Sequence, residues 1–136
     1  MDADHVAGIC SSLPGAWRDH PFGAGFPVFK VGEGKKAKMF SGLGETPPEL
    51  AEKHGHPPGE FVVLKADPDL VDELRLVHSA VLAPRYFNKA HWNHVCLTGT
   101  LDPEDIADWV EHSYRLVVTS LPKKVGSQLL AQLDAK

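Results

Sequence analysis

The sequence lacks the features that mark membrane proteins and disulfide-bonded secreted proteins. No apolar run approaches the roughly 20 residues that a membrane-spanning helix needs, and the first ten residues, MDADHVAGIC, contain no basic stretch followed by a hydrophobic one. There are only two cysteines, Cys10 and Cys96, and both fall within predicted apolar faces, which favours buried, reduced thiols over a disulfide. We therefore expect a cytoplasmic protein that does not associate with membranes.

The sequence also lacks the common patterns of catalytic and metal sites. It has no CxxC pair, no HExxH motif and no phosphate-binding loop of Walker spacing. Of its eight histidines, His54 and His56 lie in a segment rich in proline and glycine, while His91 and His94 point to opposite sides of a predicted strand. Cys96 shares a side with His94, but we expect that side to face the core, where a thiol is inert. We therefore expect a protein without catalytic residues, metal or cofactor.

A surplus of basic residues is missing as well. The formal net charge is −4, from 14 lysines and arginines against 18 acidic residues, which argues against a protein whose whole surface binds phosphates. Basic residues still gather locally, at 30–38 and again at Arg85 and Lys89. Acidic residues gather at 45–52, 67–73 and 102–111. This uneven distribution leaves room for one basic face.

Helical spacing of apolar residues recurs three times. The spacing predicts amphipathic helices over residues 4–13, 67–77 and 102–121. Asp4, Asp67 and Asp102 are suitable N-caps, and the last two are each followed by a proline that fits the first helical position. In the third helix, the hydroxyl of Ser113 can bond back to the carbonyl of Trp109.

The third helix has a clear end. Pro122 stops it, and Lys123 and Lys124 follow where cations favour the negative end of the helix dipole. The segment 122–136 is then expected to be a short basic C-terminal tail.

The segments between the helices read as strands joined by short connections. Strands are predicted over 28–31, 37–42, 61–66 and 91–97, with a short extended piece at 17–20 and a long surface loop at about 43–59 that holds one helical turn. Short links between strands require antiparallel pairing. We therefore expect one α+β domain over 1–136, in two layers, with an antiparallel sheet and helices packed on one face.

Several stretches resemble the MmcQ/YjbR family of small bacterial proteins. The resemblance runs through most of the chain in order, over HPFG, VFKVG, KMF, LK, NKAHWNHV and SYRLVVTSLPKK, the last covering residues 113–124. It implies a CyaY-like, double-wing fold and DNA binding. Members commonly carry a further basic residue after the paired lysines, whereas here Val125, Gly126 and Ser127 follow. The CyaY-like fold also raises a frataxin-like metal role, for which the acidic segment 102–111 is the candidate.

The candidate site combines cationic side chains with an amide and an indole. If Lys30 and Lys38 face the same side as His91 and Asn93, they form a basic strip on the sheet suited to phosphates and unpaired bases. We predict nucleic-acid or anion binding, without enzymatic activity, by Lys30, Lys38, Lys89, His91, Trp92, Asn93, Lys123 and Lys124. The alternative is a module that uses the same strip to bind a protein or a small acidic ligand. A monomer is the expected oligomeric state.

Overall fold

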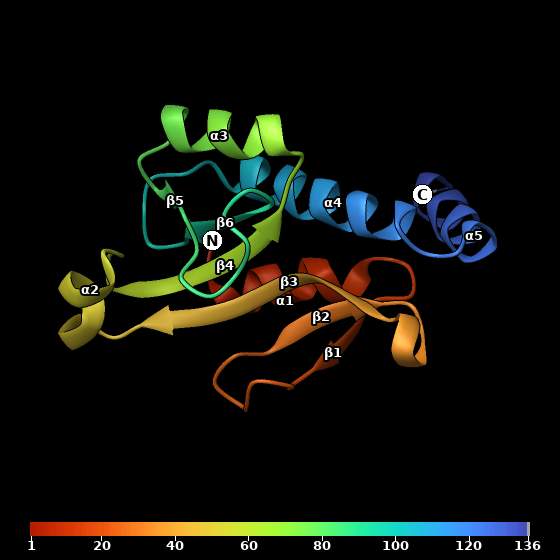
Figure 1. Cartoon of the computed structure of the whole chain (residues 1–136), viewed down its shortest axis with the longest axis horizontal. Coiled ribbons are helices and arrows are strands. Elements are labelled where there is room, and N and C mark those ends of the chain that lie inside the picture. Colours follow the sequence, from red (N-terminus) through yellow and green to blue (C-terminus); the bar gives the residue numbers. More distant parts are fainter. Residues whose placement is uncertain (136) are drawn as a thin grey trace.

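A single antiparallel sheet organises the chain. The computed structural model describes residues 1–135 and contains six strands in the order β1-β2-β3-β4-β6-β5, with every neighbouring pair antiparallel (Figure 1). The strands are β1 (Trp17–Asp19), β2 (Val28–Val31), β3 (Lys38–Thr46), β4 (Gly59–Lys65), β5 (Val81–Leu82) and β6 (Trp92–Cys96). The predicted antiparallel α+β architecture is confirmed.

Five α-helices pack around this sheet. They are α1 (Ala3–Ser12), α2 (Pro48–His54), α3 (Pro68–Val77), α4 (Pro103–Thr119) and α5 (Lys123–Asp134), with a short 3₁₀ helix η1 at Gly34–Lys36. Helices α1, α3 and α4 cover one face of the sheet, whereas α2 and α5 lie at opposite ends of the molecule (Figure 1). No helix in residues 1–135 is long and apolar enough to cross a membrane.

Two of the predicted caps are confirmed, and one lies elsewhere. The side chains of Asp67 and Asp102 accept hydrogen bonds from backbone N–H groups of α3 and α4, each with a proline in the first turn. Helix α1 begins earlier than predicted, because Asp2 rather than Asp4 caps it by accepting from the backbone N–H of His5. An N-cap side chain accepts from the N–H of the second or third helical residue ahead of it, and Asp2 does so at 2.9 Å.

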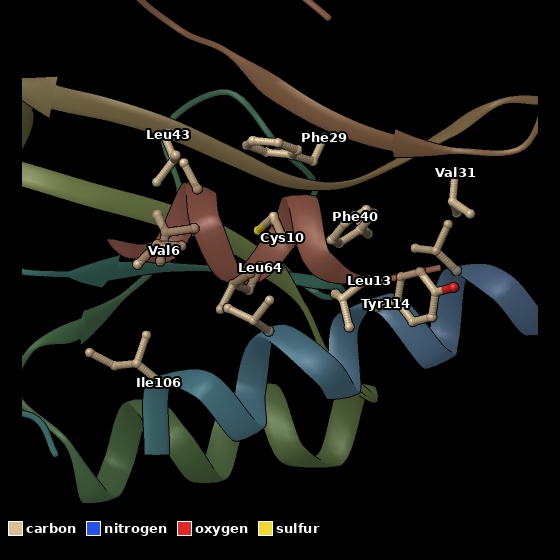
Figure 2. Packing of buried hydrophobic residues seen from close by; sticks show 14 of the residues in the cluster. Val6, Cys10, Leu13, Phe29, Val31, Phe40, Leu43, Leu64, Ile106 and Tyr114 are labelled. Atoms are coloured by element: carbon tan, nitrogen blue, oxygen red, sulfur yellow. The ribbon is translucent and has the colours of Figure 1, made fainter. Parts of the chain in front are cut away.

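The core lies between the sheet and the helices α1 and α4. Phe29, Phe40, Leu43 and Leu64 supply its sheet side, and all four are almost completely buried (Figure 2). The edge of Phe40 meets Tyr114 of α4 at 5.3 Å between ring centroids, in the T-shaped geometry that aromatic pairs prefer. Burial of this cluster provides most of the free energy that holds the helices on the sheet.

Ser113 ties α4 to two strands instead of bonding within its own helix. Its hydroxyl donates to the carbonyl of Phe40 on β3 at 2.6 Å and accepts from the backbone N–H of Lys65 on β4 at 2.9 Å. The expected bond to the carbonyl of Trp109 is therefore wrong. The single hydroxyl proton is donated to the carbonyl of Phe40, so none is left for the carbonyl of Trp109.

Two segments that the sequence left irregular are regular. Strand β3 continues to Thr46, α2 occupies residues 48–54 and β4 begins at Gly59, so that the irregular part of 43–59 is short. The expected basic tail is helix α5, which packs on α4 through Leu133 and the buried Gly126. A Cβ atom on Gly126 would lie 2.7 Å from the carbonyl oxygen of Val118, so glycine permits this close helix crossing.

Candidate ligand-binding pocket

The face of the sheet that points away from α1 and α4 carries a second group of buried side chains. Along each strand successive side chains alternate between the faces. Val62, Leu64 and Val95 point into the core, so their neighbours Phe61 and His94 point to the opposite, open face. The sequence placed His94 and Cys96 on the core side; both are buried, but they belong to the open face.

Two glycines of β3 make room for aromatic rings on this face. A Cβ atom on Gly42 would lie 2.6 Å from the ring of Phe26, and one on Gly44 would lie 2.6 Å from the ring of Phe61. Any larger residue would therefore push these rings away from the sheet. The G-x-G pattern inside a strand is the local reason that a hollow with aromatic walls can form here.

The aromatic walls come from segments that are distant in sequence. Phe26 lies 6.0 Å from Phe87 with nearly parallel rings, and 6.2 Å from Phe61 with a tilted ring. Phe87 in turn rests against Trp92 at 5.5 Å. The loop before β2, the loop before β6 and strand β4 are thus joined by one chain of ring contacts, which fixes the shape of the walls.

His94 is the most unusual residue of this face. Only 2% of it is exposed, and its ring is stacked between Phe61 at 4.0 Å and His56 at 3.9 Å. Its Nε2 atom is buried without a hydrogen-bond partner among the described residues. Burial, followed by the nearby charge of His56, lowers the pKa of His94 to about 3. His94 is therefore neutral at physiological pH and presents one unused polar atom.

His56 fastens the second ring of this stack to the neighbouring chain. Its Nε2 lies 2.9 Å from the carbonyl oxygen of Ala83 and must be the donor, since a carbonyl only accepts. This bond ties the loop after α2 to the segment after β5. The stack of His56, His94 and Phe61 is therefore held in two ways: by this hydrogen bond at His56, and by the pairing of β4 with β6, which carry Phe61 and His94.

A cavity of about 280 Å³ opens between these rings and α2. Phe61 and His94 lie on its inner side, and Arg85, His54 and Glu45 lie among the polar residues that line it. The guanidinium of Arg85 lies 5.3 Å from the ring centroid of Tyr86 and donates from Nε to the tyrosine hydroxyl at 3.0 Å. The cavity therefore combines apolar walls with a histidine and an arginine, which is the general composition of small-molecule sites.

Positive charge gathers on the side of the cavity next to α2. Arg85 and His54 also line a shallow neighbouring hollow, together with Lys89. Desolvation, followed by the charges of Arg85, Lys53 and His56, lowers the pKa of His54. These effects disfavour a further positive charge here and favour an anion.

The predicted site residues are not brought together on one face. Lys30 and Lys38 lie on opposite faces, because Lys30 pairs with Met39 and Val31 with Lys38, next to a register shift at Phe29 and Lys30. Lys30 forms an ion pair with Asp19 at 2.7 Å. The expectation of a continuous basic strip on the sheet is therefore wrong.

The remaining strand and loop residues of the prediction are also separated. Asn93 is buried under α3, where its side-chain oxygen accepts from Nε of Arg75 at 2.7 Å. His91 is exposed in the loop before β6. Lys89 and Trp92, by contrast, lie close to the pocket: Lys89 lines the neighbouring hollow, and Trp92 supports Phe87.

The paired lysines belong to a different end of the molecule. Lys123 and Lys124 form the first turn of α5 and are exposed. Nearby, Nζ of Lys38 donates to the carbonyl and the hydroxyl of Ser120, at 3.4 and 3.2 Å, where α4 ends. Lys36 lines a groove with Pro122 and Val125. We call Lys36, Lys38, Lys123 and Lys124 the lysine end.

Among residues 1–135, no group of three or more histidine, cysteine or acidic side chains is placed to hold a metal ion. Both cysteines are free and buried, in agreement with the sequence, and burial raises the pKa of Cys10 to about 11. On the open face, His94 is thus the residue with a buried polar atom that lacks a hydrogen-bond partner among the described residues.

Similarity to known proteins was found at both the sequence and the structure level. The family model described as YjbR matches residues 11–116. The proteins described as "Uncharacterized protein YjbR" from Escherichia coli K12 and O157:H7 are each 43% identical to this chain over 72 residues, which is 53% of this chain and 60% of the relative. The match thus spans about 60% of the length of these curated relatives.

Solved structures share the fold over most of the chain. A crystal structure of a Deinococcus radiodurans protein, described as a DUF419 domain, has a TM-score of 0.77 and 28% identity, and the match covers 94% of this chain and 87% of that one. A Pseudomonas syringae crystal structure has a TM-score of 0.72 and 26% identity, with 86% and 99% covered. These neighbours have the same arrangement of sheet and helices.

Proposed function

The chain belongs to the YjbR family, whose curated relatives are uncharacterised, and we propose that it is a non-enzymatic domain that binds a small acidic ligand in the pocket of His94. One observation carries this proposal: a cavity of about 280 Å³ on the open face of the sheet has aromatic walls and is bordered by both His94 and Arg85. A pocket with apolar walls and a few polar or charged groups is the general form of a small-molecule site.

The acidic character of the ligand is supported by the surroundings of the cavity. Arg85 lines it, and Lys89 and His54 border the adjoining hollow. Arginine can hold a carboxylate through two parallel hydrogen bonds. Glu45 also lines the cavity, so the ligand's anionic group belongs on the side of Arg85.

The non-enzymatic part of the proposal is supported by the state of His94. A base with a pKa of about 3 is too weak to accept a proton efficiently near neutral pH. Its ring faces are covered by Phe61 and His56, so only the ring edge can approach a ligand. The residue is better suited to recognition than to proton transfer.

The experiment is a titration of ¹⁵N-labelled protein with small carboxylic acids at millimolar concentration, with the histidine side-chain nitrogens observed by NMR. We expect the Nε2 signal of His94 to shift in a saturable manner. Histidines far from the pocket, such as His5, serve as internal controls and should keep their shifts. If no acid moves the His94 signal, the pocket does not bind small acids.

A second candidate function is nucleic-acid binding at the lysine end. The observation that favours it is the contact between Lys38 and Ser120, which brings the start of β3 to the junction of α4 and α5 beside Lys123 and Lys124. Cations gathered at one end suit contacts with phosphates, and such contacts weaken steeply with salt. This proposal retains Lys38, Lys123 and Lys124 from the site that was predicted from the sequence and leaves out its other residues.

The test is fluorescence anisotropy with random-sequence single- and double-stranded DNA from about 50 to 200 mM salt. Binding that falls by orders of magnitude over this range, and that is lost in the variant Lys123→Glu with Lys124→Glu, is the expected result. The matched control is Lys53→Glu with Lys89→Glu, which makes the same change in net charge near α2. Equal loss in both variants would mean that bulk charge, and not the lysine end, controls binding.

A further inference from the structure

We infer that the lysine end binds a single strand of nucleic acid, with an unpaired base in the groove beside Trp17 and the phosphates of the strand against the lysines. This inference rests on the second proposed function, because it names the class of nucleic acid for the same site. Three features of the groove carry it: an exposed indole that is fixed in place, two amide side chains, and the lysines on its border.

The groove is formed by three segments that are distant in sequence. It holds about 620 Å³ and is lined by the start of β1, the turn after β2 and helix α5. Gly15 and Gly32 have φ angles of 70° and 96°, and a Cβ atom on them would lie 2.8 Å from Leu129 and 3.2 Å from Leu121, respectively. These glycines let both turns lie against the leucines, so the walls are packed before any ligand binds. The volume is in the range of sites that hold small organic groups such as a nucleobase.

Trp17 presents an aromatic ring at this groove. It lines the groove and is 41% exposed, whereas Trp92 and Trp109 are each partly buried. Its Nε1 donates to the carbonyl of Gly32 at 2.9 Å, which fixes the edge of the indole. The ring stays exposed although Nζ of Lys30 lies 5.7 Å from its centroid. An exposed aromatic ring beside cations is the combination on which proteins stack the bases of single strands.

Two glutamines place amide groups along the groove. Gln128 and Gln132 both line it and are four residues apart on α5, so they lie on one side of the helix. An amide donates and accepts hydrogen bonds, as the edges of nucleobases do. In a duplex these edges are paired and the base faces are stacked, whereas an unpaired base can stack on a protein ring and bond through its edge. The indole and the amides therefore favour a single strand over a duplex.

Lysines border the groove and supply contacts for phosphates. Lys36 lines it, and Lys123 and Lys124 are exposed in the first turn of α5, next to the lining residue Val125. Glu33 also lines the groove, so the phosphates belong on the side of the lysines. The side chains of an acidic peptide would also contact the lysines, but they lack a flat ring with a hydrogen-bonding edge. That ring is what the indole and the amides suit.

Four probes separate the bases from the phosphates. They are a single strand of about 12 thymidines, a duplex of the same length, an abasic strand with the same phosphates but no bases, and poly-glutamate of equal charge. Anisotropy gives the dissociation constants, and the indole N–H signals of the three tryptophans are observed by NMR in ¹⁵N-labelled protein. We expect the thymidine strand to bind about tenfold more tightly than the abasic strand and poly-glutamate. It should shift the signal of Trp17, which the duplex should not do, and Trp92 and Trp109 should keep their shifts.

The variant Trp17→Ala tests the contact between indole and base. It should weaken the thymidine strand about tenfold and leave the abasic strand unchanged. Trp17→Phe retains a ring and should keep most of the affinity, which separates loss of stacking from loss of structure. The matched control Phe22→Ala removes another exposed aromatic ring, which lies against Phe87, and should change neither strand. Equal weakening of both strands by Trp17→Ala would mean that the indole does not contact a base.

The failures of the two proposals are distinguishable. If the abasic strand matches the thymidine strand in affinity and in its effect on Trp17, the lysine end binds phosphates but the base contact is wrong. If the duplex shifts the Trp17 signal as the single strand does, the preference for unpaired bases is wrong. If poly-glutamate binds as tightly as the thymidine strand and shifts Trp17, the inference is overturned in favour of an acidic peptide. If no probe binds at about 50 mM salt, both the inference and the second proposed function are wrong.

Discussion

Replacing Ser113 with alanine should cost far more stability than loss of a hydroxyl from a helix usually does. The residue is fully buried, and its hydroxyl bridges two strands, donating to the carbonyl of Phe40 at 2.6 Å and accepting from the N–H of Lys65 at 2.9 Å. Ser113→Ala leaves both backbone groups without this partner. Each unsatisfied buried group costs about 1–3 kcal/mol, while alanine regains roughly half a kcal/mol of helix propensity.

The net effect on the free energy of unfolding should be a loss of about 2–5 kcal/mol, a large part of the 5–15 kcal/mol that holds a typical domain folded. Urea denaturation followed by circular dichroism measures it. The matched control on the same helix is Thr119→Ala, whose exposed hydroxyl donates only to the carbonyl of Leu116. That change should stay within about 0.5 kcal/mol. A loss below about 1 kcal/mol for Ser113→Ala, with an unchanged dependence of the free energy of unfolding on urea concentration, would show that this pair of hydrogen bonds does not stabilise the fold.

Three further predictions concern close packing and titration. Gly126→Ala should cost about 1–3 kcal/mol in urea denaturation, because its Cβ would lie 2.7 Å from the carbonyl oxygen of Val118, whereas Gly8→Ala in open space on α1 should stabilise by about 0.5–1 kcal/mol. Burial raises the pKa of Tyr114 to about 12, so stability should fall as pH rises from about 10 through 12, and Tyr114→Phe should remove that fall in base-denaturation curves. The pKa of His94 is lowered to about 3, so as the pH falls below 6.5 the unfolded chain takes up a proton that the folded chain does not, and the free energy of unfolding declines toward pH 3. In His94→Gln this proton uptake is absent, and the decline should be less steep by the contribution of up to one proton.

Helix starts and the most buried strand were predictable because their signals are local. An aspartate followed by a proline sets the first turns of α3 and α4 whatever the rest of the chain does. The run Phe61 to Ala66 is apolar and rich in β-branched residues, and most of it forms β4. Such features need no knowledge of distant segments.

The secondary-structure predictions were wrong where one local sequence signal is compatible with two different structures. Pro122 ends α4, as predicted, but proline is equally acceptable just before a helix, and here it is the N-cap of α5. Leu129, Leu130 and Leu133 had the spacing of an apolar helical stripe within the segment read as a tail. Likewise, Gly42 and Gly44 weakened the strand pattern of β3, although they are what allows aromatic rings to lie against it.

The composition of the pocket depends on register, which no local pattern reveals. Lys30 and Lys38 were expected to share one face with His91 and Asn93, but the register shift at Phe29 and Lys30 leaves the two lysines on opposite faces. His94 was assigned to the core because its face could not be distinguished from the other buried face of β6. The sequence signals that could have located the pocket were the G-x-G pattern in a strand and the aromatic residues of the loops before β2 and β6.

The two proposed sites can act independently because one long strand separates them. Lys38 begins β3 at the lysine end, and Thr46 ends it at the pocket. Eight steps at about 3.3 Å place these residues roughly 25 Å apart, which is about three Debye lengths at physiological ionic strength. Charges at one site are therefore screened from the other. Binding of an acid beside Arg85 should leave DNA binding at the lysine end unchanged, and a dependence of one on the other would require a movement of β3 itself.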